Sequence, residues 1–219
     1  MVALDVPTAK DALMLRDQLG THVGWLKVGL RLFVAEGPRL IRQLSEQHPI
    51  FLDLKFHDIP NTVAQAVASA GDHGVNMINV HAAGGPEMLK AAAKAATAFP
   101  SMQLIAVTVL TSDPMPKEEA QGLVLERAMM AHDAGLKGIV CSVHEVEAIK
   151  AICGQDFITV TPGIRWGDQE LQDQKRVATP EYAIKQKADY LVVGRPILAA
   201  ANPVHAADEA VAMMHKASR

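Results

Sequence analysis

The sequence predicts an α/β protein of the (β/α)8 TIM-barrel class, with one domain that spans residues 1–219. A short apolar or β-branched run, a polar turn and a longer stretch at helical spacing recur eight times. Dividing 219 residues by eight units gives about 27 residues per unit, enough for a strand, a helix and short connections. No Gly-x-Gly-x-x-Gly segment follows the first strand, which favours a closed barrel over a doubly wound sheet.

The predicted strands are short and rich in Val, Ile and Leu. They are expected at residues 2–6, 25–28, 50–55, 77–80, 104–109, 138–141, 157–160 and 190–193. Strands of a barrel lie between an inner core and a ring of outer helices. We therefore expect each run to be followed by a helix that packs outside the barrel.

Capping residues and glycines indicate where helices begin and end. Capping signals occur in three places, at Thr8 with Asp11, at Ser142 with Glu145, and at Thr179 before Pro180. Four glycines fall where helices are expected to stop, namely Gly71, Gly74, Gly135 and Gly154.

Composition and charge exclude several classes of protein. Hydrophobic residues make up 49% of the chain, which provides a sizeable core and argues against disorder. The 21 Lys and Arg nearly balance the 24 Asp and Glu, so we expect no nucleic-acid partner. No apolar run approaches the roughly 20 residues that a membrane span needs, so we expect no membrane association.

The two cysteines, Cys141 and Cys153, are too few for a disulfide framework, which favours a cytoplasmic protein. The first residues already read as a strand, so we expect no signal peptide. We expect Cys141 to be a small buried strand residue rather than a nucleophile. No His-x-x-x-His or Cys-x-x-Cys pattern occurs, and no metal site is expected.

Charged residues gather at the ends of the first three predicted strands, where the loops of a barrel form its active-site mouth. Side-chain alternation turns Asp5, Lys27, Asp53 and Lys55 away from the apolar residues that must face the helices. We therefore expect two lysines and two carboxylates to converge in a confined space. A purely structural buried ion-pair network remains the alternative, although such pairs are weak evidence for stability. We favour a site in which flanking acids hold each lysine charged.

The segment around the third strand carries a recognisable motif. Asp53-x-Lys55-x-x-Asp58, followed by Ile-Pro-Asn-Thr62, resembles the signature of the orotidine 5'-phosphate decarboxylase family. Further matching segments follow the expected order, at Leu-Asp5-Val, Leu-Lys27-Val-Gly, Val-Leu-Thr111-Ser112, Thr-Pro-Gly163-Ile-Arg165 and Val-Gly194-Arg195-Pro-Ile. Related sugar-phosphate barrels share Asp-x-Lys-x-x-Asp, so specificity rests on its combination with Lys27 and the Gly194-Arg195 pair.

The resemblance implies decarboxylation of orotidine 5'-phosphate to uridine 5'-phosphate and CO2, the last step of de novo UMP biosynthesis, without cofactor or metal. It assigns to Lys55 the stabilisation of carbanion character at pyrimidine C6 and the donation of the proton that replaces CO2. Asp53 and Lys27 are expected to keep Lys55 charged and oriented. The other implied substrate contacts are ribose contacts from Asp5 and Lys27, and base contacts from Thr111 and Ser112.

Phosphate recognition is expected at the last two βα units. Gly194 lets a ligand approach the backbone, the next helix offers N–H groups, and Arg195 can bind phosphate bidentately. Residues 163–179 form the longest polar connection and predict a mobile lid to which Arg165 and Gln174 contribute. The alternatives are a surface charge at Arg195 and a partly helical surface insertion at 163–179.

The resemblance also implies a homodimer in which Asp58 and Thr62 reach the active site of the neighbouring subunit. The local alternative is that these two residues cap the helix that begins near Pro60. Two histidines near the predicted site have no assigned role: His57 could be structural, and His81, at the end of the fourth strand, could line the pocket.

Two other functions remain open. A Mg²⁺-dependent sugar-phosphate decarboxylase or synthase shares the barrel and the Asp-x-Lys-x-x-Asp motif, but Lys27 would repel the metal. A non-catalytic nucleotide-binding barrel would keep the phosphate site without the chemistry. The presence of Lys55 with its flanking acids argues against that second reading.

Overall fold

The computed structural model describes residues 1–109, 116–167 and 178–218 and contains a ring of eight parallel strands. Each strand pairs with the next along the chain, from β1 to β8. The ring closes where Val2 forms a parallel bridge with Val193 and the Ala3 N–H donates to the Val193 carbonyl at 2.8 Å. The predicted (β/α)8 barrel is confirmed.

Strands alternate with helices throughout the described chain. The strands are β1 Val2–Ala3, β2 Leu26–Gly29, β3 Ile50–Phe56, β4 Met77–His81, β5 Gln103–Val107, β6 Gly138–Val140, β7 Ile158–Thr161 and β8 Tyr190–Leu191. The α-helices are α1 Ala9–Leu19, α2 Leu30–Glu36, α3 Pro38–Ser45, α4 Pro60–Asp72, α5 Gly85–Ala96, α6 Lys117–Asp133, α7 Val146–Cys153, α8 Pro180–Lys185, α9 Arg195–Leu198 and α10 Pro203–Ala217. Short 3₁₀ helices occupy Gly20–His22, Ala82–Gly84 and Val143–Glu145.

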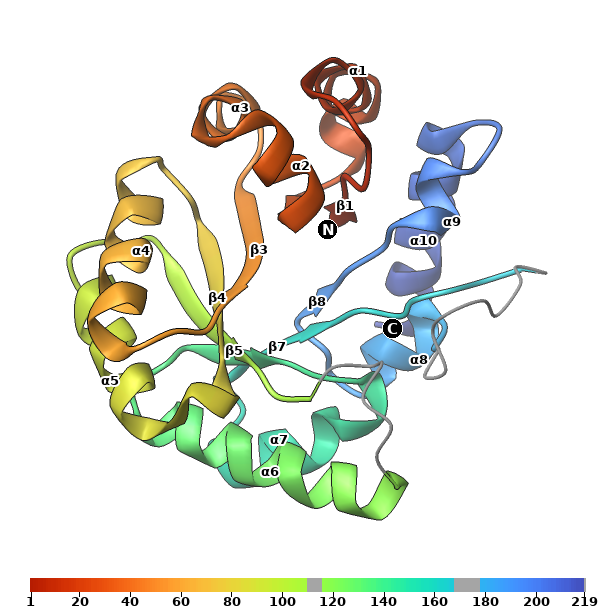
Figure 1. The fold of residues 1–219 in the computed structure, drawn as a ribbon. Helices are drawn as coiled ribbons and strands as arrows, with labels where there is room; N and C mark the ends of the chain where they lie inside the picture. Colours follow the sequence, from red (N-terminus) through yellow and green to blue (C-terminus); the bar gives the residue numbers. More distant parts are fainter. Residues whose placement is uncertain (110–115, 168–177, 219) are drawn as a thin grey trace.

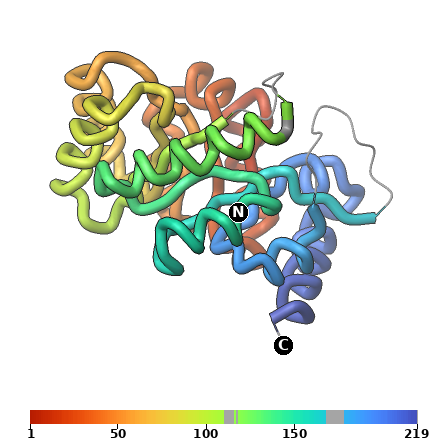
Figure 2. Tube along the Cα trace, turned by 90° about the horizontal axis from the view of Figure 1, so that it is seen from below, coloured from red at the N-terminus to blue at the C-terminus, as the bar shows by residue number. Residues whose placement is uncertain are grey.

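The helices surround the strands as an outer layer (Figure 1). Figure 2 views the barrel from the side, with the yellow helices α4 and α5 and the blue helix α10 at opposite ends of the molecule. Helix α1 packs against α10, so the first and last helices are neighbours. None of the helices in the described ranges is long and apolar enough to cross a bilayer.

Two apolar cores follow from strand alternation. A large core fills the space between the strands and the helices, with Leu52, Ile78 and Val80 among its fully buried members. A smaller core fills the barrel interior and consists of Ala3, Phe51, Met77, Ile105, Val160 and Val192. Because successive side chains of one strand serve different cores, each strand is buried on both faces, and charge is left to the strand ends.

Most predicted helix starts are confirmed by their caps. Thr8 accepts a hydrogen bond from the Asp11 N–H at 3.2 Å, and Thr179 accepts one from the Tyr182 N–H at 3.2 Å. The predicted capping box at Ser142 is also present, but it opens the 3₁₀ helix that precedes α7.

Gly71 is the second-last residue of α4, one residue before the helix ends at Asp72, so the helix stops within one residue of the predicted place. A Cβ atom at this position would lie 2.4 Å from the ring of Phe99. The glycine therefore allows the Phe99 ring to pack directly against the α4 backbone. Gly74, Gly135 and Gly154 do follow helices, with positive φ values that favour glycine.

Candidate active site

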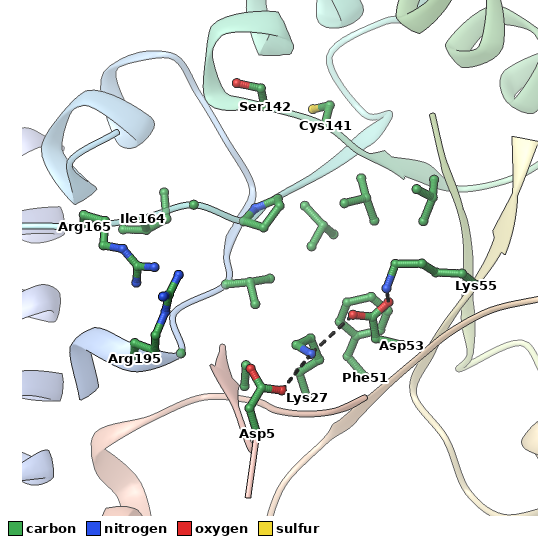
Figure 3. Close-up of a pocket in the computed structure, with 18 of the residues that line it drawn as sticks. Asp5, Lys27, Phe51, Asp53, Lys55, Cys141, Ser142, Ile164, Arg165 and Arg195 are labelled. Atoms are coloured by element: carbon green, nitrogen blue, oxygen red, sulfur yellow. Dashed lines mark hydrogen bonds and ion pairs between the residues drawn. The ribbon is translucent and has the colours of Figure 1, made fainter. Parts of the chain in front are cut away.

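A cavity of about 310 Å³ opens at the carboxyl ends of the strands and has the size of a small-molecule site. Charged residues line two sides of it, with Asp5, Lys27, Asp53 and Lys55 together and Arg165 and Arg195 across from Lys55 and Asp53 (Figure 3). Inner-core side chains such as Phe51 and Val192 supply apolar surface between them. Cationic groups at two separate places suit a ligand that carries two anionic groups.

The first charged group forms an alternating chain of acids and lysines. The Lys55 ammonium lies 2.6 Å from Asp53 Oδ1, and the Lys27 ammonium lies 3.3 Å from Asp53 Oδ2. On its other side Lys27 Nζ is 3.6 Å from Asp5 Oδ1. The structure thus brings together the four residues that strand alternation predicted.

The Asp53 carboxyl is only 15% exposed, yet its pKa is held below the usual range. Burial by itself raises this pKa and is the largest single effect, but the nearby Lys27 and Lys55 ammonium groups both lower it. Hydrogen bonds from Lys55 and from Asn79 lower it further. Asp53 is therefore a carboxylate at neutral pH, and an ammonium group faces each of its two oxygens.

The Lys55 side chain reaches the cavity from an irregular stretch of β3, not from a regular strand in which side chains simply alternate. Its φ of 52° lies in the left-handed region, which costs a non-glycine residue about 1–3 kcal/mol. The register between β3 and β4 shifts between Leu52 and Phe56, around this residue. Regular alternation gave the correct direction for the Lys55 side chain, but the pattern of residue types carried no sign of the bulge.

Asn79 of β4 is the residue at this site that sequence reasoning missed. Its side-chain amide donates to Asp53 Oδ1 at 2.7 Å and accepts from the Lys55 N–H at 2.8 Å. The available signal was a polar residue at an inward position of an otherwise apolar strand.

Two glycines leave room for the charged side chains. A Cβ at Gly29 would lie 3.3 Å from Lys27 Nζ, and one at Gly194 would lie 3.5 Å from Asp5 Oδ2. A Cβ at Gly29 would require the Lys27 ammonium to move by a few tenths of an ångström, whereas the distance at Gly194 is that of an ordinary van der Waals contact.

The Arg165 side of the cavity belongs to the start of the long connection after β7. The Arg165 N–H donates to the Ala178 carbonyl at 2.9 Å, and the Ala178 N–H donates to the Gly163 carbonyl at 3.1 Å. Trp166 is buried, and its indole N–H donates to Glu209 of α10 at 3.0 Å. These contacts fix both ends of the connection beside the cavity.

The expectation that the helix after Gly194 offers a set of free N–H groups is wrong in part. This helix, α9, has only four residues, and Pro196 has no N–H. The N–H groups of Ile197 and Leu198 both donate to the Gly194 carbonyl at 3.0 Å. Anion binding by this helix start is therefore limited to the Gly194–Arg195 backbone and the Arg195 side chain.

Asp58 and Thr62 are exposed and do not line the cavity. Asp58 Oδ1 accepts from the adjacent Ile59 N–H at 2.6 Å. Helix α4 has Ile59 at its N-cap and no side-chain capping hydrogen bond, so the alternative that Asp58 and Thr62 merely cap this helix is wrong.

His81 does not line the cavity. Its ring stacks on His57 with centroids 5.4 Å apart, and its Nδ1 accepts from the Ala83 N–H at 3.2 Å. Cys141 does line the cavity while being buried, and burial, with Glu145 and Asp189, raises the pKa of its thiol well above the usual range. The thiol is thus protonated at neutral pH, as expected of a packing residue rather than a nucleophile.

Three predicted site residues lie outside the described ranges, namely Thr111, Ser112 and Gln174. Most of the predicted lid, at 168–177, also lies outside them. Within the described ranges, no three His, Cys, Asp or Glu side chains gather in a way that could hold a metal ion.

Comparison with known proteins gives a consistent result. A model of the orotidine 5'-phosphate decarboxylase / HUMPS family matches residues 1–210. The chain is 49% identical to orotidine 5'-phosphate decarboxylase of Nitrosococcus oceani, over 94% of this chain and 93% of that protein. It is 48% identical to the enzyme of Legionella pneumophila, over 93% of each chain. The crystal structure of orotidine 5'-phosphate decarboxylase from Lactobacillus acidophilus superposes with a TM-score of 0.85 at 35% identity, covering 97% of each chain.

Proposed function

The chain belongs to the orotidine 5'-phosphate decarboxylase / HUMPS family. On that premise, we propose that Lys55 is the residue that drives decarboxylation in this protein. The reaction converts orotidine 5'-phosphate to uridine 5'-phosphate and CO2, the last step of de novo UMP biosynthesis. The observation that carries the proposal is the Lys55 ammonium, 2.6 Å from an ionised Asp53 in a cavity with two arginines across from it.

Loss of CO2 from the pyrimidine leaves an electron pair at C6, and this charge must be stabilised. An ammonium group held beside C6 stabilises this charge electrostatically, because a preorganised cation aimed at developing charge is worth more than solvent water. The same group then donates a proton to C6, and the electron pair forms the new C–H bond. Lys55 supplies both effects in our proposal, with no other group required to accept electrons.

Asp53 and Lys27 are proposed to prepare Lys55 for this role. Asp53 binds the Lys55 ammonium directly, and Lys27 completes the neutralisation of the carboxylate from the other side. Since the pKa of Asp53 is lowered, its carboxylate stays ionised at neutral pH. Asp5 and Lys27 are further proposed to contact the ribose, and Thr111 and Ser112 the base.

The cavity also accommodates the two anionic groups of the substrate. We propose that Arg195, with the Gly194 backbone, binds the phosphate, and that Arg165 and Gln174 assist from the connection after β7. The substrate carboxylate then lies near Lys55 and Asp53. This orientation is supported by the separation of the two cationic regions in Figure 3.

We propose that the active unit is a homodimer in which Asp58 and Thr62 reach the neighbouring active site. Large apolar side chains are exposed close to Asp58 in sequence and on the helix that follows β2, with Ile59 66%, Leu30 55% and Val34 80% exposed. A contiguous group of exposed apolar side chains marks an interaction surface, and we propose that these three belong to one. Both segments begin where a strand ends, and the cavity is lined by residues at the same strand ends, so a second copy on this face would lie next to it.

Turnover of purified protein tests the proposal. After dialysis against EDTA, the protein is incubated with orotidine 5'-phosphate, and the loss of substrate absorbance and the formation of uridine 5'-phosphate are measured. We expect full conversion without added metal, because both Asp53 oxygens already face ammonium groups that oppose a cation. Activity restored only by Mg²⁺ would favour the metal-dependent alternative, and tight nucleotide binding without turnover would favour a non-catalytic barrel.

A further inference from the structure

Asn79 is a fully buried polar residue in the wall of the barrel beside the reactive lysine. It lies on β4, is 0% exposed, and follows Met77 by two positions. Met77 belongs to the inner core, so alternation turns the Asn79 side chain toward the barrel interior as well. An amide at this depth is costly unless its donor and its acceptor are both used.

Both ends of the Asn79 amide are bonded to the reactive pair. Nδ2 donates to Asp53 Oδ1 at 2.7 Å, and Oδ1 accepts from the Lys55 N–H at 2.8 Å. Asp53 Oδ1 is also the atom that receives the Lys55 ammonium at 2.6 Å. One side chain thus contacts the backbone of Lys55 and the carboxylate that binds its ammonium group.

The backbone of Lys55 is where such support is needed. Between Leu52 and Phe56 strand β3 advances four residues, while its partner β4 advances only two, from Ile78 to Val80. This bulge removes regular ladder bonds, and Lys55 takes a left-handed φ of 52°. The side-chain oxygen of Asn79, Oδ1, accepts a hydrogen bond from the Lys55 N–H in the place where a regular ladder would use a backbone carbonyl of β4.

We propose that Asn79 is a positioning residue for the decarboxylation. It holds the left-handed backbone of Lys55 and fixes the Asp53 carboxylate, and together these aim the ammonium group at the substrate. The inference rests on the proposed function, since it assumes that Lys55 is the reactive group. The Asn79 amide provides both contacts, whereas an ionised carboxylate has no donor and an aliphatic side chain has neither group.

The test compares Asn79→Leu and Asn79→Asp with wild type, measuring kcat and KM for orotidine 5'-phosphate, Kd for uridine 5'-phosphate, and thermal unfolding. Thr159→Val is the matched control. Thr159 is also 0% exposed on a barrel strand and also bonds a carboxylate, Asp189, at 2.8 Å, but it does not line the cavity. Its replacement is expected to lower Tm and to leave kcat unchanged.

We expect Asn79→Leu to lower kcat about 100-fold, since a displacement of about 1 Å at a reactive group has an effect of that size. The Kd for uridine 5'-phosphate should change little, because Arg195 and the apolar surface remain. A wild-type kcat in this variant, or losses of kcat and nucleotide affinity that run in parallel as they would from general disorder of the site, would overturn the inference.

Asn79→Asp tests the inference even if the leucine variant does not fold. It keeps an acceptor for the Lys55 N–H but places a second carboxylate beside Asp53, whose other charged neighbours are Lys27 and Lys55, with Asp5 beyond Lys27. In the pH profile of kcat/KM, the acidic limb should move to higher pH by about one unit. An unchanged acid limb together with an unchanged kcat would overturn the inference.

Lys55→Ala, assayed in parallel, separates the two levels of the argument. If Lys55→Ala turns over like wild type, the proposed function fails. If Lys55→Ala is inactive while Asn79→Leu is fully active, the positioning inference alone fails.

Discussion

Asp53 determines the electrostatics of the cavity because each of its oxygens faces a different ammonium group. Removing it leaves Lys27, whose side chain is only 11% exposed, with Asp5 at 3.6 Å as its remaining carboxylate partner in this chain of charges. Uncompensated charge in a largely buried position is strongly destabilising. The same residue therefore affects stability and, in our proposal, catalysis.

We predict that Asp53→Asn lowers the free energy of unfolding by about 3 kcal/mol at pH 7. The pKa of Asp53 is lowered in the folded protein, so its stabilising contribution is complete above the ordinary carboxyl pKa of about 3.9. The contribution is lost as pH falls through the lowered pKa, because wild-type Asp53 then becomes neutral like Asn. Urea unfolding of both proteins from pH 7 to pH 3 measures this difference. A difference that stays constant down to pH 3 would contradict the assignment.

We predict that Arg195→Ala raises KM for orotidine 5'-phosphate about 10- to 100-fold, the effect of losing hydrogen bonds to a charged group. Orotidine, which lacks the phosphate, should be turned over by both proteins with similar kcat/KM. Steady-state kinetics with the two substrates makes the comparison. Equal effects on both substrates would show that Arg195 does not bind the phosphate.

The strands of this barrel pack so closely that one position in β6 admits only glycine. A Cβ at Gly138 would lie 2.3 Å from the backbone carbonyl oxygen of Ile158 on β7. In contrast, Gly122 lies on the exposed side of α6, with no atom within 4 Å of the place of a Cβ. Gly138 is therefore required by the close pairing of β6 with β7, whereas no neighbouring atom requires a glycine at position 122 of α6.

We predict that Gly138→Ala lowers the free energy of unfolding by about 3 kcal/mol, because the β6–β7 pairing must separate. Gly122→Ala, its control, should raise stability by about 0.8 kcal/mol through helix propensity. Denaturant unfolding measures both changes. A Gly138→Ala protein as stable as wild type would refute the close contact between these strands.

The elements show which features a sequence can predict. Strand positions followed from apolar runs bounded by turn residues, and most observed strand starts lie within one residue of the predicted ones. Strand ends were less accurate: β1 stops at Ala3, and the Asp5 N–H donates back to the Ala3 carbonyl at 2.9 Å. A local helix-stop pattern placed Gly71 near the end of α4 but did not reveal its contact with Phe99.

At the scale of the whole molecule, closure of the barrel brings the first and last strands together. Asp5 and Gly194 are far apart in sequence, yet a Cβ at Gly194 would lie 3.5 Å from Asp5 Oδ2. The motif and strand alternation were sufficient to group the charged residues of the first three strands. The motif and strand alternation could not identify Asn79 as a site residue, because its role depends on a bulge in the neighbouring strand.

The homodimer, the single domain over residues 1–219 and the cytoplasmic location stay predictions. Among them, the dimer has the most direct consequence for the chemistry, since in our proposal the partner chain supplies Asp58 to each cavity. The cytoplasmic location rests on Cys141 and Cys153, which are free thiols.

We predict that mixing inactive Lys55→Ala and Asp58→Ala chains restores part of the activity. In a symmetric dimer with shared sites, each mixed dimer has one intact site, so an equal mixture should reach about a quarter of wild-type activity. Activity is measured after subunit exchange has been verified with differently tagged chains. No recovery after verified exchange would place Asp58 in its own subunit's site or outside any site.

The central claim is that the Lys55 ammonium both stabilises charge at C6 and delivers the proton. The measurement that tests it most directly is the kcat of Lys55→Ala on orotidine 5'-phosphate, with Kd for uridine 5'-phosphate measured on the same preparation. We predict a kcat lower by more than about 10⁴-fold, since electrostatic stabilisation and proton donation are lost together, while the nucleotide still binds. A Lys55→Ala protein that binds the nucleotide and decarboxylates at the wild-type rate would contradict the claim.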